Sequence, residues 1–289
     1  MQKHLVIPDC QVTPDTPTDH LEWIGKFILE KKPDVIINLG DFADMESLSS
    51  YDKGKLQYEG RRYKKDITAS KQAMQRLLQP IEDYNVSRVK NKRKQYKPRK
   101  VLTIGNHEYR IERAIQDNSY MDGFMGVGDL EYESFGWEVH PFLKIVEIDG
   151  VHYSHYFANP LSGRPFGGEN IGIRLKNIGF SFVMGHQQVY MLGVKSLNNG
   201  RRLRGLVQGA CYLHDEEYRG CQGNNEWRGI FVLHEVKNGN YSLMEVSLSY
   251  LCQRYEGISL WRFMQKNYPD IFRNSTWMQY QQKFSEGIS

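Results

Sequence analysis

The sequence has no apolar run long enough to cross a membrane, and its first apolar stretch stops at Pro8, too early for a signal-peptide core. Internal repeats and low-complexity linkers are also absent. Cysteine is scarce, and no pair has the C-x-x-C spacing of many metal and redox sites; the four are Cys10, Cys211, Cys221 and Cys252. These absences argue against a membrane protein and against a disulfide-stabilised secreted domain. We therefore expect a cytoplasmic protein that forms a single domain over residues 1–289.

The net charge is only +4, but the positively charged residues are unevenly distributed along the chain. Residues 88–100 contain eight Lys or Arg and no acid, and residues 200–205 form a smaller basic cluster. Such runs are typical of solvated surface. The alternative is a contact with the phosphate backbone of nucleic acid, with Tyr96 as a stacking residue.

The hydrophobic pattern of the first forty residues predicts a strand, a helix and a second strand. Short apolar runs end at Asp9 and Asp41, and the segment between them has apolar residues at helical spacing, with Thr18 or Asp19 as the cap and Pro33 as the stop; these are Leu21, Ile24, Phe27 and Ile28. Continuous apolar strands joined by a helix are typical of parallel sheets buried on both faces.

The rest of the chain predicts a mixed α/β domain. Residues 59–84 have the pattern of a long charged helix, residues 100–108 of a third strand and residues 110–117 of a short helix. Residues 136–157 predict two strands joined at Asp149-Gly150, and residues 227–248 a hairpin around Asn238-Gly239. We therefore expect parallel strands in the first half and hairpins in the second.

Two segments extend this domain. Residues 50–100 are expected to form a helical, basic insertion. Residues 257–289 form an aromatic C-terminal extension, for which packing on the core is expected and a subunit contact is the alternative.

Five apolar runs end in polar clusters, at residues 8–11, 40–44, 105–108, 152–156 and 185–188. Each cluster has a simple explanation by itself: Asp41 as a helix cap, for example, or His107 as a loop histidine. Ligands of open α/β sheets bind at the carboxyl ends of the strands, so five such clusters favour one shared site. Their Asp, Asn, His and Gln side chains are suitable ligands for a divalent metal ion.

These clusters resemble the ordered motifs of the calcineurin-like metallophosphoesterases: D-x-H, G-D-x-x-D, G-N-H-[DE], a lone His, and G-H-x-H. The resemblance spans residues 4–235, and compact members encoded by bacteriophages are the most similar in organisation. The matches are Asp9-x-Gln11, Gly40-Asp41-x-x-Asp44, Gly105-Asn106-His107-Glu108, His155 and Gly185-His186-x-Gln188. The resemblance implies a two-sheet α/β sandwich flanked by helices, and a metal-dependent phosphoesterase.

The resemblance also implies the metal ligands. Asp41 would bridge two divalent ions; Asp9, Gln11 and Gln188 would belong to the first position, and Asn106, His155 and His186 to the second. His152 lies two residues before His155 and is the alternative lone histidine. We prefer His155 because it is closer to the end of its strand.

The same resemblance implies a catalytic mechanism. A metal-bound hydroxide would attack phosphorus in line, and two ions would stabilise the attacking and leaving oxygens. His107 would protonate the leaving oxygen, oriented by Asp44.

The chain departs from the family at Gln11 and Gln188, where the motifs have histidine. An amide oxygen is a weaker ligand than imidazole for borderline ions, so we expect the first ion to bind less tightly than the second. Mn²⁺ is the expected metal, with Zn²⁺, Fe²⁺, Ni²⁺ and Mg²⁺ as alternatives.

The leading functional hypothesis is hydrolysis of a phosphodiester, in a nucleotide or nucleic acid, because of the two basic clusters. One alternative is a phosphomonoesterase acting on a small substrate. Another is a non-catalytic binding or scaffold protein on a degenerate fold, since two ligand positions are altered. The sequence indicates no residues for substrate contact.

Overall fold

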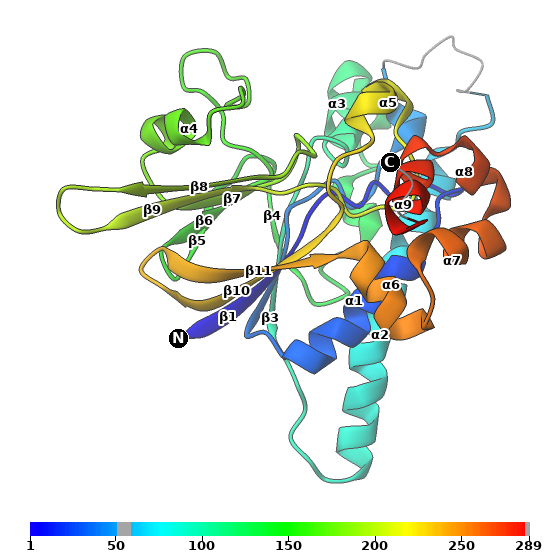
Figure 1. The fold of residues 1–289 in the computed structure, drawn as a ribbon. Coiled ribbons are helices and arrows are strands. Elements are labelled where there is room, and N and C mark those ends of the chain that lie inside the picture. The colour runs from blue at the N-terminus through cyan, green and yellow to red at the C-terminus, as the bar shows by residue number, and fades with distance from the viewer. Residues whose placement is uncertain (51–58, 287–289) are drawn as a thin grey trace.

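The computed structural model describes residues 1–50 and 59–286, which form two β-sheets packed face to face with helices outside them (Figure 1). The first sheet has the order β11-β10-β1-β2-β3-β4, with β1 Gln2–Ile7, β2 Val35–Asn38, β3 Arg99–Thr103, β4 Glu138–His140, β10 Gly229–Lys237 and β11 Asn240–Ser247. The second has the order β5-β6-β7-β9-β8, with β5 Val146–Ile148, β6 Val151–Tyr153, β7 Phe182–Met184, β8 Met191–Ser196 and β9 Arg202–Val207. The helices are α1 Asp19–Lys31, α2 Tyr63–Lys90, α3 Arg110–Asp117, α4 Ile171–Ile178, α5 Gly220–Gly223, α6 Leu248–Glu256, α7 Leu260–Asn267, α8 Pro269–Asn274 and α9 Thr276–Glu286.

Strands β1, β2 and β3 are parallel neighbours, as the apolar runs predict. Leu5 and Ile7 of β1 pack in the core beneath the helices, whereas Val6 packs between the two sheets. A third apolar cluster lies between the second sheet and α4. Both faces of the sheets are therefore buried, and the predicted two-sheet α/β sandwich is confirmed.

Helix α1 buries the predicted stripe against α2, but its capping differs from the expectation. The side chain of Thr18 makes no capping hydrogen bond. It accepts a hydrogen bond from Arg76 Nη1 of α2 at 3.2 Å, and Arg76 Nη2 donates to Asp19 at 2.7 Å. The start of α1 therefore links the two helices.

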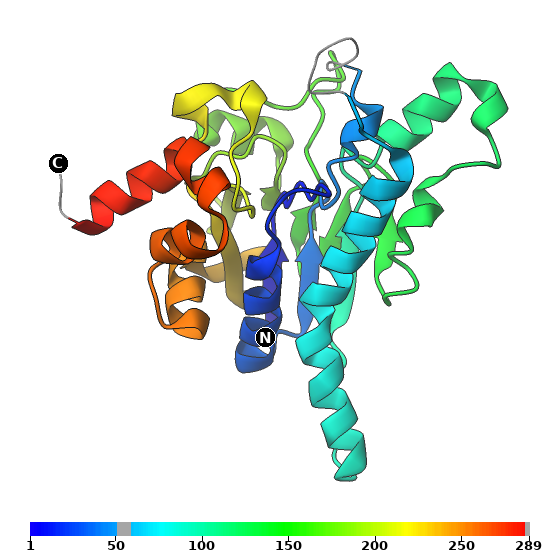
Figure 2. The ribbon, with the colours of Figure 1, turned by 90° about the vertical axis from the view of Figure 1, so that its right-hand side faces the viewer.

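Helix α2 begins and ends later than residues 59–84, the predicted range. Met74, Leu77 and Leu78 are buried, but the helix continues to Lys90 with polar residues that need no core. This end projects beyond the sheets (Figure 2). Part of the expected insertion, residues 51–58, lies outside the described residues. Within the part of the chain that the structure describes, no helix is long and apolar enough to cross a membrane.

The predicted hairpin over residues 136–157 is only partly correct. Ile148 pairs with Val151 across Asp149-Gly150, as expected. The first predicted strand is divided, because β4 joins the first sheet beside β3 and β5 joins the second. Pro141 follows β4 directly and has no N–H for a sheet hydrogen bond, which explains the break.

The second half of the chain is also not made of hairpins alone. Strand β7 lies parallel to both β6 and β9. Strand β8, which the sequence did not predict, forms a hairpin with β9. The hairpin at Asn238-Gly239 is confirmed, with Lys237 paired to Asn240.

The aromatic C-terminal extension packs on the helical side of the first sheet. Trp261, Phe263, Phe272 and Trp277 are all buried in the same apolar cluster as β1 and α1. Arg228 at the start of β10 lies over the Trp277 ring, 4.1 Å from its centroid. Core packing, the expected role of these aromatic residues, is confirmed.

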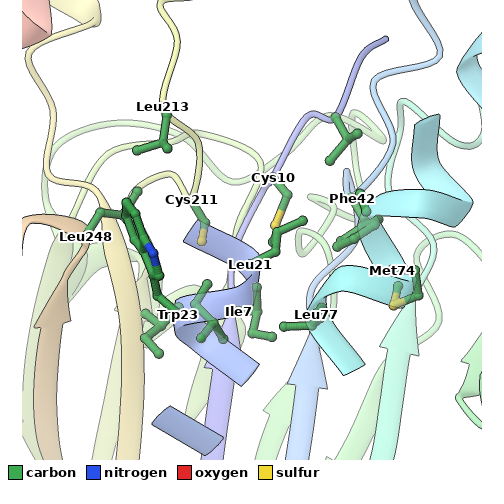
Figure 3. Close-up of a cluster of buried hydrophobic side chains, with 14 of the residues drawn as sticks. Ile7, Cys10, Leu21, Trp23, Phe42, Met74, Leu77, Cys211, Leu213 and Leu248 are labelled. Carbon is green, nitrogen blue, oxygen red and sulfur yellow. The ribbon is translucent and has the colours of Figure 1, made fainter. Parts of the chain in front are cut away.

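Two cysteines of the same cluster lie near a buried histidine, His20. Cys10 and Cys211 lie among Leu21, Leu213 and other apolar residues (Figure 3). The donor atoms of Cys10, Cys211 and His20 all lie within 4.8 Å of one another. His20 is 1% exposed, and neither ring nitrogen has a hydrogen-bond partner among the described residues.

We expect His20→Leu to stabilise the protein, and more strongly in acid. Burial lowers the pKa of His20 to about 3. Between pH 6.5 and pH 3 the unfolded chain therefore binds a proton that the folded chain does not, so stability falls as pH falls. At about 1.4 kcal/mol per pKa unit, this costs on the order of 4 kcal/mol at pH 3.

Leucine removes both this cost and the unpartnered ring, which itself costs about 1–3 kcal/mol. Urea unfolding at about pH 7 and about pH 4.5 measures the effect, with the partly exposed His234→Leu as the matched control. A destabilised His20→Leu variant that has also lost a bound metal would contradict this prediction and show that the three donors hold an ion.

Candidate active site and metal centre

Polar residues from five strand ends meet at one edge of the two sheets. The side-chain oxygen of Asn106, after β3, lies 2.8 Å from His155 Nε2 and 2.7 Å from His186 Nδ1. Asp41 Oδ2, after β2, lies 3.2 Å from His155 Nε2. Asp9, after β1, accepts a hydrogen bond from the backbone N–H of His186. The structure therefore brings together the residues that the motifs assigned to a metal centre.

The contacts of His155 fit a cation at the second position. Its Nδ1 lies 2.9 Å from the Leu39 carbonyl oxygen, so the ring proton is on Nδ1 and Nε2 carries a lone pair. This lone pair faces the Asp41 carboxylate, which only accepts, and a proton or a metal ion must separate the two. Burial lowers the pKa of His155, but Asp41 and Asp9 outweigh it and raise the pKa to about 9. The site thus favours positive charge here.

The structure distinguishes the two candidate lone histidines. His155 is completely buried beside Asp41. His152 lies in β6 with its ring stacked on Phe180, at 3.9 Å between centroids, and its Nδ1 beside the Ser181 carbonyl oxygen. His155 is therefore the histidine placed to bind an ion.

The first position fits a cation only in part. Asp9 Oδ2 is buried and has no hydrogen-bond partner among the described residues, as expected for a carboxylate oxygen that binds a cation. Burial raises the pKa of Asp9 to about 7. Gln11 and Gln188 lie side by side, since both amide nitrogens contact the hydroxyl of Tyr218, at 3.2 and 2.9 Å. The second position thus has its four candidate ligands in place, whereas at the first both glutamines are tied to a tyrosine.

His107 has the environment of a general acid. Its Nδ1 makes a short contact with Asp44 Oδ1, and its Nε2 lies 3.7 Å from Asp41 Oδ2. Burial lowers the pKa of His107, but the carboxylates of Asp41 and Asp44 outweigh it and raise the pKa above its ordinary value. The imidazolium form, which can give a proton to a leaving oxygen, is therefore favoured.

Arg110 contacts both members of this pair from the first turn of α3. Its Nη1 donates to the Asp44 carbonyl oxygen at 2.8 Å, and its Nη2 lies 3.4 Å from His107 Nε2. Burial raises the pKa of Asp44, but His107 and Arg110 outweigh it and keep the carboxyl ionised. No motif in the sequence indicates a role for Arg110, although it lies only three residues after His107.

Glu108 holds together the two loops that carry the candidate metal ligands and the candidate general acid. Its buried carboxylate accepts the backbone N–H groups of Asp41, Phe42, Ala43 and Gly105 at 2.7–3.1 Å. The motif G-N-H-[DE] contained this residue, but nothing in the sequence indicated that it reaches back to residues 41–43. The carboxylate fixes the backbone of Asp41 without itself being a candidate ligand.

Two motif glycines are required by close approach. A Cβ at Gly105 would lie 2.1 Å from Asp41 Oδ1, and a Cβ at Gly185 would lie 2.3 Å from Asp9 Oδ1. The carboxylates can lie this near the neighbouring strand ends only because these positions have no side chain.

Several candidate ligands also have left-handed backbone conformations, at positive φ, that non-glycine residues rarely adopt. They are Gln11 (44°), Asp41 (49°), His186 (65°) and Gln188 (55°). Each costs about 1–3 kcal/mol, and such strain is typical of functional sites.

Neither basic cluster lies at this edge. Residues 88–98 precede β3, and the arginines of residues 200–205 lie at the start of β9, whereas the site is at the carboxyl ends of the strands. Tyr96, considered as a stacking residue, donates its hydroxyl to the Pro33 carbonyl oxygen and packs against the core. The two basic clusters therefore lie away from the candidate active site.

Comparison with known protein families agrees with this geometry. The model of the calcineurin-like phosphoesterase family matches residues 3–218. No curated protein matches the sequence. Similar solved structures include TT1561 of Thermus thermophilus, at 7% identity and TM-score 0.41, with 86% of this chain and 99% of that chain covered. Another is Yfce, a phosphoesterase from E. coli, at 11% identity and TM-score 0.38, with 85% and 99% covered.

The family match includes all five strand-end clusters, and it covers well over half of the chain. This chain belongs to the calcineurin-like phosphoesterase family and is a metal-dependent phosphoesterase.

Proposed function

We propose that the enzyme hydrolyses a phosphodiester, such as that of a nucleotide or nucleic acid, with His107 as the general acid. The observation that carries this proposal is the buried His107–Asp44 pair beside Asp41. An alkoxide leaving group needs a proton, and an imidazolium held by a carboxylate supplies one.

The donor set supports a diester over a monoester. A diester phosphate carries one negative charge, whereas a monoester carries up to two near neutral pH. Only the second metal position has all of its candidate ligands free to bind, so the site offers less positive charge than two complete positions would. The lower charge is better matched to the singly charged ester.

The residues divide into metal-binding and proton-handling groups. Asp9, Asp41, Asn106, His155 and His186 would hold divalent metal, for which we propose Mn²⁺. Bound metal supplies charge neutralisation at the phosphate and lowers the pKa of an attacking water. His107 donates the proton, Asp44 keeps its ring oriented, and Arg110 keeps Asp44 ionised. The free thiols of Cys10, Cys211 and Cys252 support a cytoplasmic location.

Hydrolysis of two chromogenic esters tests the proposal. With Mn²⁺, we expect kcat/KM to be higher for bis(p-nitrophenyl) phosphate than for p-nitrophenyl phosphate. The reverse order would identify a phosphomonoesterase. No hydrolysis of either ester, with Mn²⁺ still bound, would support the binding or scaffold alternative.

A further inference from the structure

The side chain of Gln188 is buried, and its carbonyl oxygen is already occupied. Oε1 accepts hydrogen bonds from Arg219 Nη1 at 2.7 Å and from the hydroxyl of Tyr212 at 2.9 Å. A guanidinium only donates, so this contact identifies the atom as the oxygen. Because a metal ion binds an amide through its oxygen, an ion here would have to displace Arg219 or lie beside its positive charge.

The amide nitrogen of Gln188 holds a second residue in place. Nε2 lies 2.9 Å from the Tyr218 hydroxyl, which Gln11 Nε2 also approaches to 3.2 Å. Tyr218 is 65% exposed, yet its hydroxyl lies between two buried glutamines. The residue therefore extends from the surface to the first metal position.

Gln11 is not equivalent to Gln188, although both replace histidines of the motifs. Gln11 Oε1 is buried and has no hydrogen-bond partner among the described residues. The Gln11 oxygen is therefore free to bind an ion, whereas Gln188 Oε1 is not.

The segment that carries Tyr218 and Arg219 is itself firmly held. Asn224 accepts the backbone N–H of Glu216 at 2.9 Å and donates to the Glu216 carbonyl oxygen at 2.8 Å. Arg228 donates to the Tyr212 carbonyl oxygen at 3.3 Å and to Asp215 at 3.1 Å. These contacts hold the residues that precede Tyr218 and Arg219 in the chain.

The guanidinium of Arg219 has N–H groups that are not used in its contact with Gln188. Its Nη1 also lies 3.2 Å from the Gln188 carbonyl oxygen, whereas its Nε and Nη2 make no hydrogen bond with the residues that the structure describes. A guanidinium with free N–H groups beside a metal position is suited to a phosphate oxygen.

We infer that Tyr218 and Arg219 are phosphate-positioning residues of this active site, held there by Gln188, which is therefore not a metal ligand. The inference rests on the proposed function for its substrate. It assigns a substrate-binding role to a segment that begins at the last residue of the family match and continues beyond it.

Metal binding by calorimetry tests the role of Gln188 without any activity measurement. Gln188→Ala, Tyr218→Phe and Arg219→Gln each break the same network, but only the first removes a candidate ligand. We expect all three to bind Mn²⁺ with the wild-type stoichiometry and within about threefold of the wild-type affinity. Gln11→Ala, the matched control, should weaken the first ion roughly tenfold or more. Loss of the first ion in Gln188→Ala, but not in the other two, would overturn the inference.

Phosphate binding tests the other part of the inference, the phosphate-positioning role. Arg219→Gln and Gln188→Ala should weaken binding of inorganic phosphate to the Mn²⁺-loaded protein by roughly tenfold. The first variant loses the charge-assisted contact with phosphate, and the second loses the side chain that holds Arg219 in place. They should raise KM for bis(p-nitrophenyl) phosphate more than they lower kcat. Unchanged phosphate affinity in a folded Arg219→Gln variant would overturn the inference. Phosphate affinity is measured without ester hydrolysis. The result would therefore still test this inference if the diester proposal failed.

Discussion

Replacement of His107 by alanine is expected to lower kcat by roughly 10²- to 10⁴-fold, the usual contribution of a general acid. The reason is that His107 lies between Asp41 and Asp44, which raise its pKa and keep it ready to give a proton. Metal binding should persist, because His107 is outside the candidate ligand set. Steady-state hydrolysis of bis(p-nitrophenyl) phosphate and Mn²⁺ calorimetry measure the two effects.

Two further variants serve as controls. Asp44→Asn should give a smaller defect, because it weakens the orientation of the ring without removing it. His152→Ala, at a histidine stacked on Phe180 and outside the candidate site, should retain nearly full activity. Unchanged turnover in His107→Ala, or an equal loss in His152→Ala, would remove His107 from the mechanism.

Glu108→Ala is expected to have the largest effect on stability, at least about 3 kcal/mol. Its carboxylate accepts four backbone N–H groups, and each buried donor left unpaired costs about 1–3 kcal/mol before relaxation. The loop that carries Asp41 should also relax, and Mn²⁺ affinity should fall roughly 10- to 100-fold, as for residues that orient metal ligands.

Chemical denaturation and calorimetry of the same samples measure both effects. Glu112→Ala, an exposed glutamate in the first turn of α3, is the matched control and should change neither by much. Glu108→Gln should lie in between, since its amide keeps one acceptor oxygen. A Glu108→Ala variant with wild-type stability would show that the backbone of residues 41–43 does not depend on this carboxylate.

The sequence by itself determined the order of the first strands and helices and the place of the site. Leu5 and Val6 show why: adjacent residues of a strand face opposite ways, so a continuous apolar run predicts burial on both faces. The carboxyl ends of parallel strands meet at one edge, so the clusters after β1, β2 and β3 had to lie close together. Periodicity and strand direction are local properties, and they can be read from the chain alone.

Tertiary structure decided what those residues contact. The basic run at residues 88–100 looked relevant to phosphate, but it precedes β3 and ends in its first two residues, so it lies at the opposite edge from the site. The apparent strand around Pro141 is divided between two sheets. This division depends on which strands lie beside each part in the folded domain.

The roles of the site residues depended still more on distant contacts. Glu108 binds backbone groups 65 to 67 residues away, and Gln188 meets Tyr218 across 30 residues. Gln11 and Gln188 are chemically identical, and only the folded chain gives one a free oxygen and the other an arginine. Such pairings follow from the packing of the whole domain, because neither spacing nor residue type specifies which distant groups will meet.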